Sequence, residues 1–185
     1  MQNGYAAAAL LGAGTGIRSM AGLAMLATSD AAPRNSPFRS VVVRAGALAA
    51  ITGEALADKF APLPPRTGPL PLAGRMVLAA AAAGVAARWR GRDPLVPALI
   101  GAGTAAATAW AATAVRGAAE RHGLPDAWPA LGEDAVVVAL GRATHGQLQA
   151  TPSHHLAAAG ASLAAGPALA AAGRARSPIR STIHS

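Results

Sequence analysis

Six long apolar segments, separated from one another by prolines, glycines and arginines, constrain the fold of this chain more than any other feature. Each segment has 20 to 24 residues. A helix of that length crosses a bilayer core about 30 Å thick, because each residue rises about 1.5 Å. Strands would leave unpaired backbone groups in lipid, and alanine favours helix, so the segments predict helices. They cover residues 5–28, 41–60, 70–89, 94–116, 128–148 and 154–173.

The composition favours a membrane protein over a soluble helical bundle. Hydrophobic residue types make up 52% of the chain and charged residues only 13%, whereas soluble domains carry roughly 25% charged residues. A soluble bundle would also show a charged face at helical spacing, and residues 95–115 and 155–173 contain no charged residue. We therefore expect an all-α, polytopic membrane bundle of about six transmembrane helices. The expected location is a bacterial cell membrane, with the lipid bilayer as partner.

The net charge of +8 does not predict nucleic-acid binding. The basic residues fall mostly in short gaps between apolar runs rather than along one polar stripe. Aromatic residues, on which bases would stack, make up only 3% of the chain. Arginines at the ends of apolar helices are typical of membrane proteins.

Few features of the sequence suggest catalysis, and none suggests a cofactor. The chain has no cysteine, which excludes disulfides, thiolate metal sites and cysteine nucleophiles. His145, His154 and His155 do not have a metal-ligand spacing, so we expect no metal site. No nucleophile–base arrangement is visible. We expect no enzyme activity, although a membrane-embedded hydrolase stays open as a third interpretation.

A weak internal repeat suggests a symmetric organisation of one domain. Leu11-Gly-Ala-Gly-Thr15 recurs as Ile100-Gly-Ala-Gly-Thr104, at an offset of 89 positions. The expected domain covers residues 1–173, with repeats over 5–89 and 94–173, and a basic tail over 174–185. Halves of three helices each would be inverted relative to one another, as in many transporters. The other interpretation is a six-helix bundle with chance similarity.

Glycines in and near this motif are expected to let helices pack closely. Gly12 and Gly16 form a small-xxx-small pair, and Gly101 belongs to the second copy of the motif. Gly12-Ala-Gly-Thr-Gly16 also looks like a dinucleotide-binding loop. Such a loop follows a strand, whereas here an alanine run precedes it. We favour packing.

Charged residues within or beside the apolar segments are the candidate functional site. Arg18 lies near the middle of the first segment, where it needs a partner such as Glu54 or Glu133. Alternate crossings, counted from the beginning of the chain, place the other candidates on the side where the first segment begins. The full set is Arg18, Glu54, Asp58, Lys59, Arg75, Arg116, Glu133 and Asp134. Their carboxylates could bind a cation, relay protons or simply be solvated helix ends.

These residues carry a resemblance to a known family. Gly14-Thr-Gly-Ile-Arg18-Ser19, Glu54-Ala-Leu-Ala-Asp58-Lys59-Phe-Ala-Pro62, Ala73-Gly-Arg75 and Pro129-Ala-Leu-Gly-Glu133-Asp134 resemble motifs of the "domain of unknown function 4126" family of small bacterial membrane proteins. The resemblance covers roughly residues 5–150. It implies a multi-pass membrane protein and no particular activity. The chain departs from the family pattern over residues 62–71, which contain no acidic residue.

Two functions compete at this stage. The first is a transporter or channel-like carrier of a small solute or ion, with its site where the charged residues converge. The alternative is a structural or assembly protein of the membrane, in which the charges only fasten helices together. The sequence does not indicate an oligomeric state.

Overall fold

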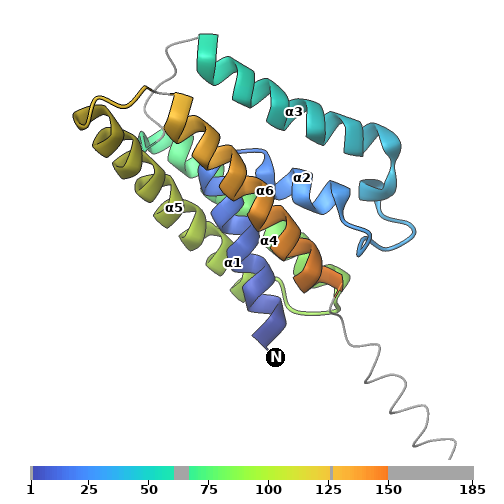
Figure 1. Ribbon diagram of the computed structural model, residues 1–185. Coiled ribbons are helices and arrows are strands. Elements are labelled where there is room, and N and C mark those ends of the chain that lie inside the picture. The colour runs from blue at the N-terminus through green and yellow to red at the C-terminus, as the bar shows by residue number, and fades with distance from the viewer. Residues whose placement is uncertain (1, 61–66, 126, 150–185) are drawn as a thin grey trace, which may run out of the picture. The chain divides into compact units, whose positions relative to one another are not determined.

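The computed structural model describes residues 2–60, 67–125 and 127–149, and the regular structure in these ranges is entirely helical. This confirms the all-α expectation. The helices are α1 (Gln2–Ile17), α2 (Ala21–Thr28), the 3-10 helix η1 (Pro37–Arg39), α3 (Val41–Phe60), α4 (Pro69–Trp89), α5 (Leu95–Arg121) and α6 (Ala127–Gln149). They belong to one compact unit, residues 1–150 (Figure 1). The expected helix over 154–173 and the tail over 174–185 lie outside the described residues.

Two glycines end the long helices α4 and α5. Gly91 has φ +64° and Gly123 has φ +69°, the left-handed conformation that glycine adopts without a steric penalty. Beyond Gly91, the amide of Arg92 donates to the carbonyl of Ala87 at 3.0 Å, which closes a Schellman motif. Leu124 closes the same motif after Gly123. The sequence therefore stops both helices locally, before any tertiary contact is considered.

The first apolar segment is two helices, not the single helix expected over 5–28. The helical hydrogen-bond ladder of α1 ends at Arg18, whose amide donates to the carbonyl of Gly14 at 2.9 Å. The next two amides, of Ser19 and Met20, donate instead to the carboxylate of Glu54. A carboxylate from a distant helix thus replaces the carbonyls that would have continued the helix.

Helix α2 folds back beside α1 after this break. A Cβ on Gly22 would contact Thr15 and the carbonyl of Leu11, and a Cβ on Gly14 would contact Met25. The chain thus reverses direction between Ile17 and Ala21, and α3 then packs against α2 and η1.

The additional reversal makes α1 and α5 parallel. Gly12 lies against Gly101, and Gly16 lies against Ala105, so residue numbers rise together along the two helices. Helix α4 is antiparallel to both, because Gly101 lies against Ala79. The beginning of α1 therefore lies beside the α4–α5 turn, where Gly4 contacts Arg92. We expected the beginning of the chain to lie on the same side as the candidate charged residues. This expectation is wrong, because the beginning of α1 lies at the opposite end of the helices.

The two copies of the repeated motif pack directly against each other. Thr15 donates to the carbonyl of Leu11, and Thr104 donates to the carbonyl of Ile100, each at 2.8 Å. The copies thus share a local conformation and meet in equal register, since Gly12 opposes Gly101 at the offset of the repeat. In an inverted repeat, the two equivalent helices α1 and α5 would run antiparallel. They run parallel, so the expected inversion is wrong for this pair of helices. The third pair of the expected repeat lies outside the described residues.

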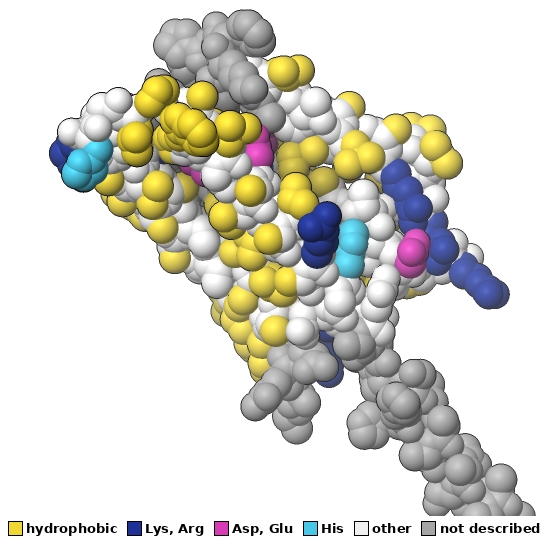
Figure 2. Space-filling model, viewed as in Figure 1, with side chains coloured by type: hydrophobic (Ala, Val, Ile, Leu, Met, Phe, Trp, Pro, Cys, Tyr) yellow, Lys and Arg dark blue, Asp and Glu magenta, His cyan; other side chains and the backbone are white. Residues whose placement is uncertain are grey.

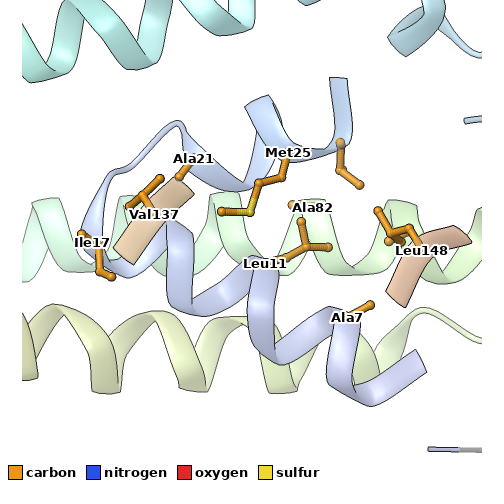
Figure 3. Close-up of a cluster of buried hydrophobic side chains, with 10 residues drawn as sticks. Ala7, Leu11, Ile17, Ala21, Met25, Ala82, Val137 and Leu148 are labelled. Atoms are coloured by element: carbon orange, nitrogen blue, oxygen red, sulfur yellow. The ribbon is translucent and has the colours of Figure 1, made fainter. Parts of the chain in front are cut away.

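The core is built on α1, which packs against α2, α4, α5 and α6. Leu11 is fully buried near its centre, close to Met25 from α2 and Ala82 from α4, while Val137 and Leu148 from α6 lie towards the two ends of the cluster (Figure 3). Alanine fills much of the remaining space, because helices approach closely only where side chains are small.

Two of the helices, α4 and α5, are long and apolar enough to cross a membrane. Helix α1 is apolar but shorter. Large hydrophobic side chains stand exposed on the outer faces of the helices, among them Leu70, Val77, Leu99, Trp110 and Val115. Figure 2 shows hydrophobic side chains over much of the visible face. The six-span bundle expected from the sequence thus has two candidate spans within the described residues.

Candidate functional site

Arg18 lies at the break between α1 and α2, with only 2% of its surface exposed. Its Nε and Nη2 atoms both donate to Oδ1 of Asp134, at 3.1 and 2.9 Å. The expected partners were Glu54 and Glu133, and the described ion pair is instead with the neighbouring aspartate at the beginning of α6. The expected position near the middle of a helix is also wrong, because the helix ends there.

Glu54 acts as an N-terminal cap for α2. Its Oε1 accepts a hydrogen bond from the amide of Ser19 at 2.9 Å, and its Oε2 accepts one from the amide of Met20 at 3.2 Å. Negative charge is favourable at this position, because the helix dipole is positive there. On its other side, Oε1 of Glu54 lies 3.8 Å from Nη2 of the buried Arg75 in α4. One carboxylate thus joins three helices.

Arg116 and Glu133 form a two-point ion pair between α5 and α6. The guanidinium donates from Nε to Oε1 at 2.6 Å and from Nη2 to Oε2 at 2.7 Å. Glu133 is 9% exposed and Arg116 about one-third exposed, so the carboxylate is the better shielded partner. Parallel hydrogen bonds of this kind are among the strongest charge-assisted contacts in proteins.

The three contact sets join into one group, which we call the charged cluster: Arg18, Glu54, Arg75, Arg116, Glu133 and Asp134. Glu133 and Asp134 are consecutive, and Glu54 bonds the two amides that follow Arg18. The cluster therefore draws on α1, α3, α4, α5 and α6 at one end of these helices. The other two predicted site residues, Asp58 and Lys59, lie in α3, but their side chains lie outside the described residues.

An apolar groove of about 360 Å³ lies between α5 and α6 beside the charged cluster. Ile17, Thr108, Val115 and Val136 line it, and Glu133 is the charged residue in its wall. The sequence does not predict this groove, because its lining combines residues from α1, α5 and α6 that lie far apart in the chain.

The glycines predicted to pack helices lie at close approaches of the backbone. A Cβ on Gly12 would overlap the carbonyl oxygen of Gly101, and a Cβ on Gly16 would overlap that of Ala105. A Cβ on Gly101 would lie 2.8 Å from the carbonyl oxygen of Ala79 in α4. Thr108 adds a hydrogen bond across the same interface, from its hydroxyl to the carbonyl of Ala13 at 3.2 Å.

His145 is a residue whose contacts the sequence gives no reason to expect. Its Nε2 lies 3.2 Å from Oγ1 of Thr28 and 3.1 Å from the carbonyl oxygen of Met25, so it joins α6 to α2. Within the described ranges, no group of three or more histidine or acidic side chains is arranged to hold a metal ion. His154 and His155 lie outside those ranges.

Comparisons of the chain with protein-family models, with curated proteins and with solved structures gave no match. The resemblance to the "domain of unknown function 4126" family therefore stays a prediction. Any assignment of function rests on the geometry described above.

Proposed function

We propose that this chain is a multi-pass integral membrane protein of a bacterial plasma membrane. The length and hydropathy of α4 and α5 support a membrane location, as do the large hydrophobic side chains exposed on their outer faces. The uncharged stretch 155–173 adds a further apolar segment in the sequence.

Solubility tests this location. We expect the purified full-length chain to be monodisperse in a mild detergent and to aggregate when the detergent is removed, because exposed apolar faces then meet water. Size-exclusion chromatography with light scattering distinguishes the two states. A monodisperse chain in buffer without detergent would contradict the proposal.

We propose further that the charged cluster fastens the helix ends together and has a structural role. The observation that carries this proposal is that all three described carboxylates of the cluster have partners within the chain. Asp134 accepts from Arg18, Glu133 from Arg116, and Glu54 from two backbone amides. A charge in an apolar environment is costly unless it is paired, and pairing of this kind stabilises the packed state over its alternatives.

Replacing Arg116 and Glu133 tests the structural role. Glu133→Leu removes the carboxylate that accepts two hydrogen bonds from Arg116. Arg116→Met removes the two guanidinium donors that bond the buried carboxylate of Glu133. Each single variant should lower the free energy of unfolding by about 1–3 kcal/mol. The double variant should recover most of that loss, because paired apolar side chains replace an ion pair well. Thermal unfolding in detergent measures all three. A double variant as unstable as the sum of the singles would contradict the structural role.

A carrier of a small solute or ion is the second candidate. Two observations favour it: α1 and α2 form a broken helix with a buried arginine at the break, and Glu133 lines an open groove. Broken helices and unwound backbone form substrate sites in many transporters. In this interpretation, Glu54 and Glu133 release their partners when the solute binds.

Flux through the membrane separates the two candidates. The full-length chain in proteoliposomes would be tested with Na⁺, K⁺, protons and chloride as probes. Wild-type flux above that of empty vesicles, abolished in Glu54→Gln and Glu133→Gln, would support the carrier and contradict a purely structural cluster. Glu120→Gln is a matched control, because Glu120 is exposed near the end of α5 and outside the cluster.

A further inference from the structure

A cavity of about 330 Å³ lies at the opposite end of the helices from the charged cluster. It is partly open, and it is bordered by the first turns of α1 and α5, the last turns of α4 and the turn that joins α4 to α5. Its polar lining comes from Tyr5, Arg90, Arg92 and Asp93, and the rest is mostly alanine, valine and proline. None of these residues belongs to the charged cluster.

Arg90 and Arg92 bring two positive charges to the wall of this cavity. Nη2 of Arg90 donates to the backbone carbonyl of Gln147, which orients its guanidinium from α6. The Arg92 guanidinium lies against Gly4, in the space that a Cβ there would occupy. Burial, and then the charge of Arg92, lower the pKa of Arg90 from its ordinary value, although a guanidinium stays protonated in proteins. The two charges therefore disfavour each other, and an anion between them would relieve the repulsion.

Helix dipoles act on the cavity from both sides. Helices α1 and α5 begin there with the positive ends of their dipoles, whereas α4 ends there with the negative end of its own. Asp93 is the acidic residue of the lining, and its Oδ1 accepts a hydrogen bond from the amide of Leu95 at 2.8 Å. Its charge is thus directed to the beginning of α5. Two guanidinium groups against one carboxylate leave the cavity net positive.

We propose that this cavity binds a phosphate group, with Arg90 and Arg92 as its donors. A guanidinium presents a planar fork of N–H groups, and a phosphate offers enough acceptor oxygens for two such forks. The volume lies at the lower end of the range for small-molecule sites. The apolar wall formed by Ala7, Ala86, Ala87 and Val96 would hold an apolar group attached to the phosphate.

Two sources of this phosphate are compatible with the chemistry. One is the headgroup of an anionic phospholipid, since the α4–α5 turn joins the two helices that are long enough to cross a membrane. The other is inorganic phosphate or a soluble phosphate ester. The proposal concerns the phosphate-binding residues and is independent of the role of the charged cluster.

Binding by the full-length chain in a neutral detergent tests the proposal and distinguishes the sources. Inorganic phosphate would be titrated by calorimetry against chloride at matched ionic strength. Phosphatidylglycerol would be titrated by native mass spectrometry against diacylglycerol, which lacks the phosphate. Saturable binding of phosphatidylglycerol alone supports a lipid source, and saturable binding of both phosphate probes supports a site for phosphate in general. Absence of saturable binding of both overturns the proposal.

Variants assign the binding to this cavity. Arg92→Gln should weaken the binding of the phosphate probe about tenfold or more, because it removes a charge-assisted donor. Gly4→Ala should also weaken binding, because the added methyl group displaces the Arg92 guanidinium without removing its charge. The matched controls are Arg34→Gln, an exposed arginine outside the cavity, and Gly46→Ala, where nothing lies within 4 Å.

Circular dichroism and size-exclusion chromatography would show that each variant is folded. Should Arg92→Gln fail to fold, Gly4→Ala still tests the site, because it keeps every charge. Unchanged binding in Gly4→Ala and in any folded Arg92→Gln overturns the proposal. An equal loss of phosphate binding in Arg34→Gln would also overturn the proposal, because the loss would then reflect the net charge of the protein and not this cavity.

Discussion

Arg18 and Asp134 are 116 positions apart in the chain, and they meet where α1 breaks and α6 begins. Two nitrogens of the guanidinium share one carboxylate oxygen. The arginine is 2% exposed, whereas the aspartate is 44% exposed. The pair is therefore asymmetric. If Asp134 is removed, water does not readily take its place beside the buried Arg18; if Arg18 is removed, water can solvate the exposed Asp134.

Asp134→Ala should lower the free energy of unfolding by about 2–3 kcal/mol, because the buried guanidinium of Arg18 loses the acceptor of two of its hydrogen bonds. The matched control is Asp30→Ala. Asp30 is 74% exposed and lies 3.5 Å from Arg44, so its loss should cost no more than about 1 kcal/mol. Thermal or chemical unfolding in detergent measures both. Equal losses in the two variants would show that burial of Arg18 does not determine the strength of its pair.

Glu54→Ala should destabilise the beginning of α2 specifically, because the amides of Ser19 and Met20 lose their acceptor. Loss of a helix cap costs about 1 kcal/mol, which corresponds to roughly fivefold faster local exchange. Hydrogen–deuterium exchange measured on peptides that cover the break should show the increase. Glu120→Ala, on the exposed end of α5, should leave exchange at the break unchanged. Equal protection in Glu54→Ala would mean that another group caps α2.

Thr108→Val tests the hydrogen bond that crosses from α5 to α1. The single hydroxyl proton is shared between the carbonyl of Thr104 in its own helix, at 2.8 Å, and the carbonyl of Ala13 in α1, at 3.2 Å, so its loss should cost up to about 1 kcal/mol. Thr113→Val is the control, because its hydroxyl bonds the carbonyl of Ala109 within α5. The difference between the two melting temperatures isolates the contribution of the interface. A larger effect at Thr113 would contradict this assignment.

Gly12→Ala should separate α1 from α5, because the new methyl group overlaps the backbone of Gly101 and the side chain of Thr104. Overpacking of this kind costs about 1–3 kcal/mol. Gly103→Ala introduces the same methyl group on α5, where nothing lies within 4 Å. It should be neutral or slightly stabilising, because alanine favours helix over glycine. The free energies of unfolding of both variants, measured together, check the prediction.

Local signals predict most of the helices and their ends. The sequence predicts α3 over 41–60, as the structure has it, because proline-rich and glycine-rich gaps flank that apolar run. The end of α4 follows from Gly91, which adopts the left-handed conformation. These signals depend on a few neighbouring residues, so a single sequence reveals them.

The break after Ile17 was not predicted, because its cause is remote. Glu54 is 35 positions away from Ser19, and no local residue types indicate that its carboxylate would take the amides of the next turn. The parallel alignment of α1 and α5 depends on this break, so the error in sidedness follows from it. The partner of Arg18 was missed for a similar reason, since Glu133 and Asp134 are consecutive and only the rotation of α6 decides between them.

The contact between Gly12 and Gly101 is not reciprocal, because a Cβ on Gly12 would meet Gly101, whereas a Cβ on Gly101 would meet Ala79 in α4. A symmetric homodimer requires the reverse contact as well, so the two copies of the motif are not related by a twofold axis. The second copy instead serves two interfaces, and a bulky residue at Gly101 would disturb the packing of α1 and of α4 at once.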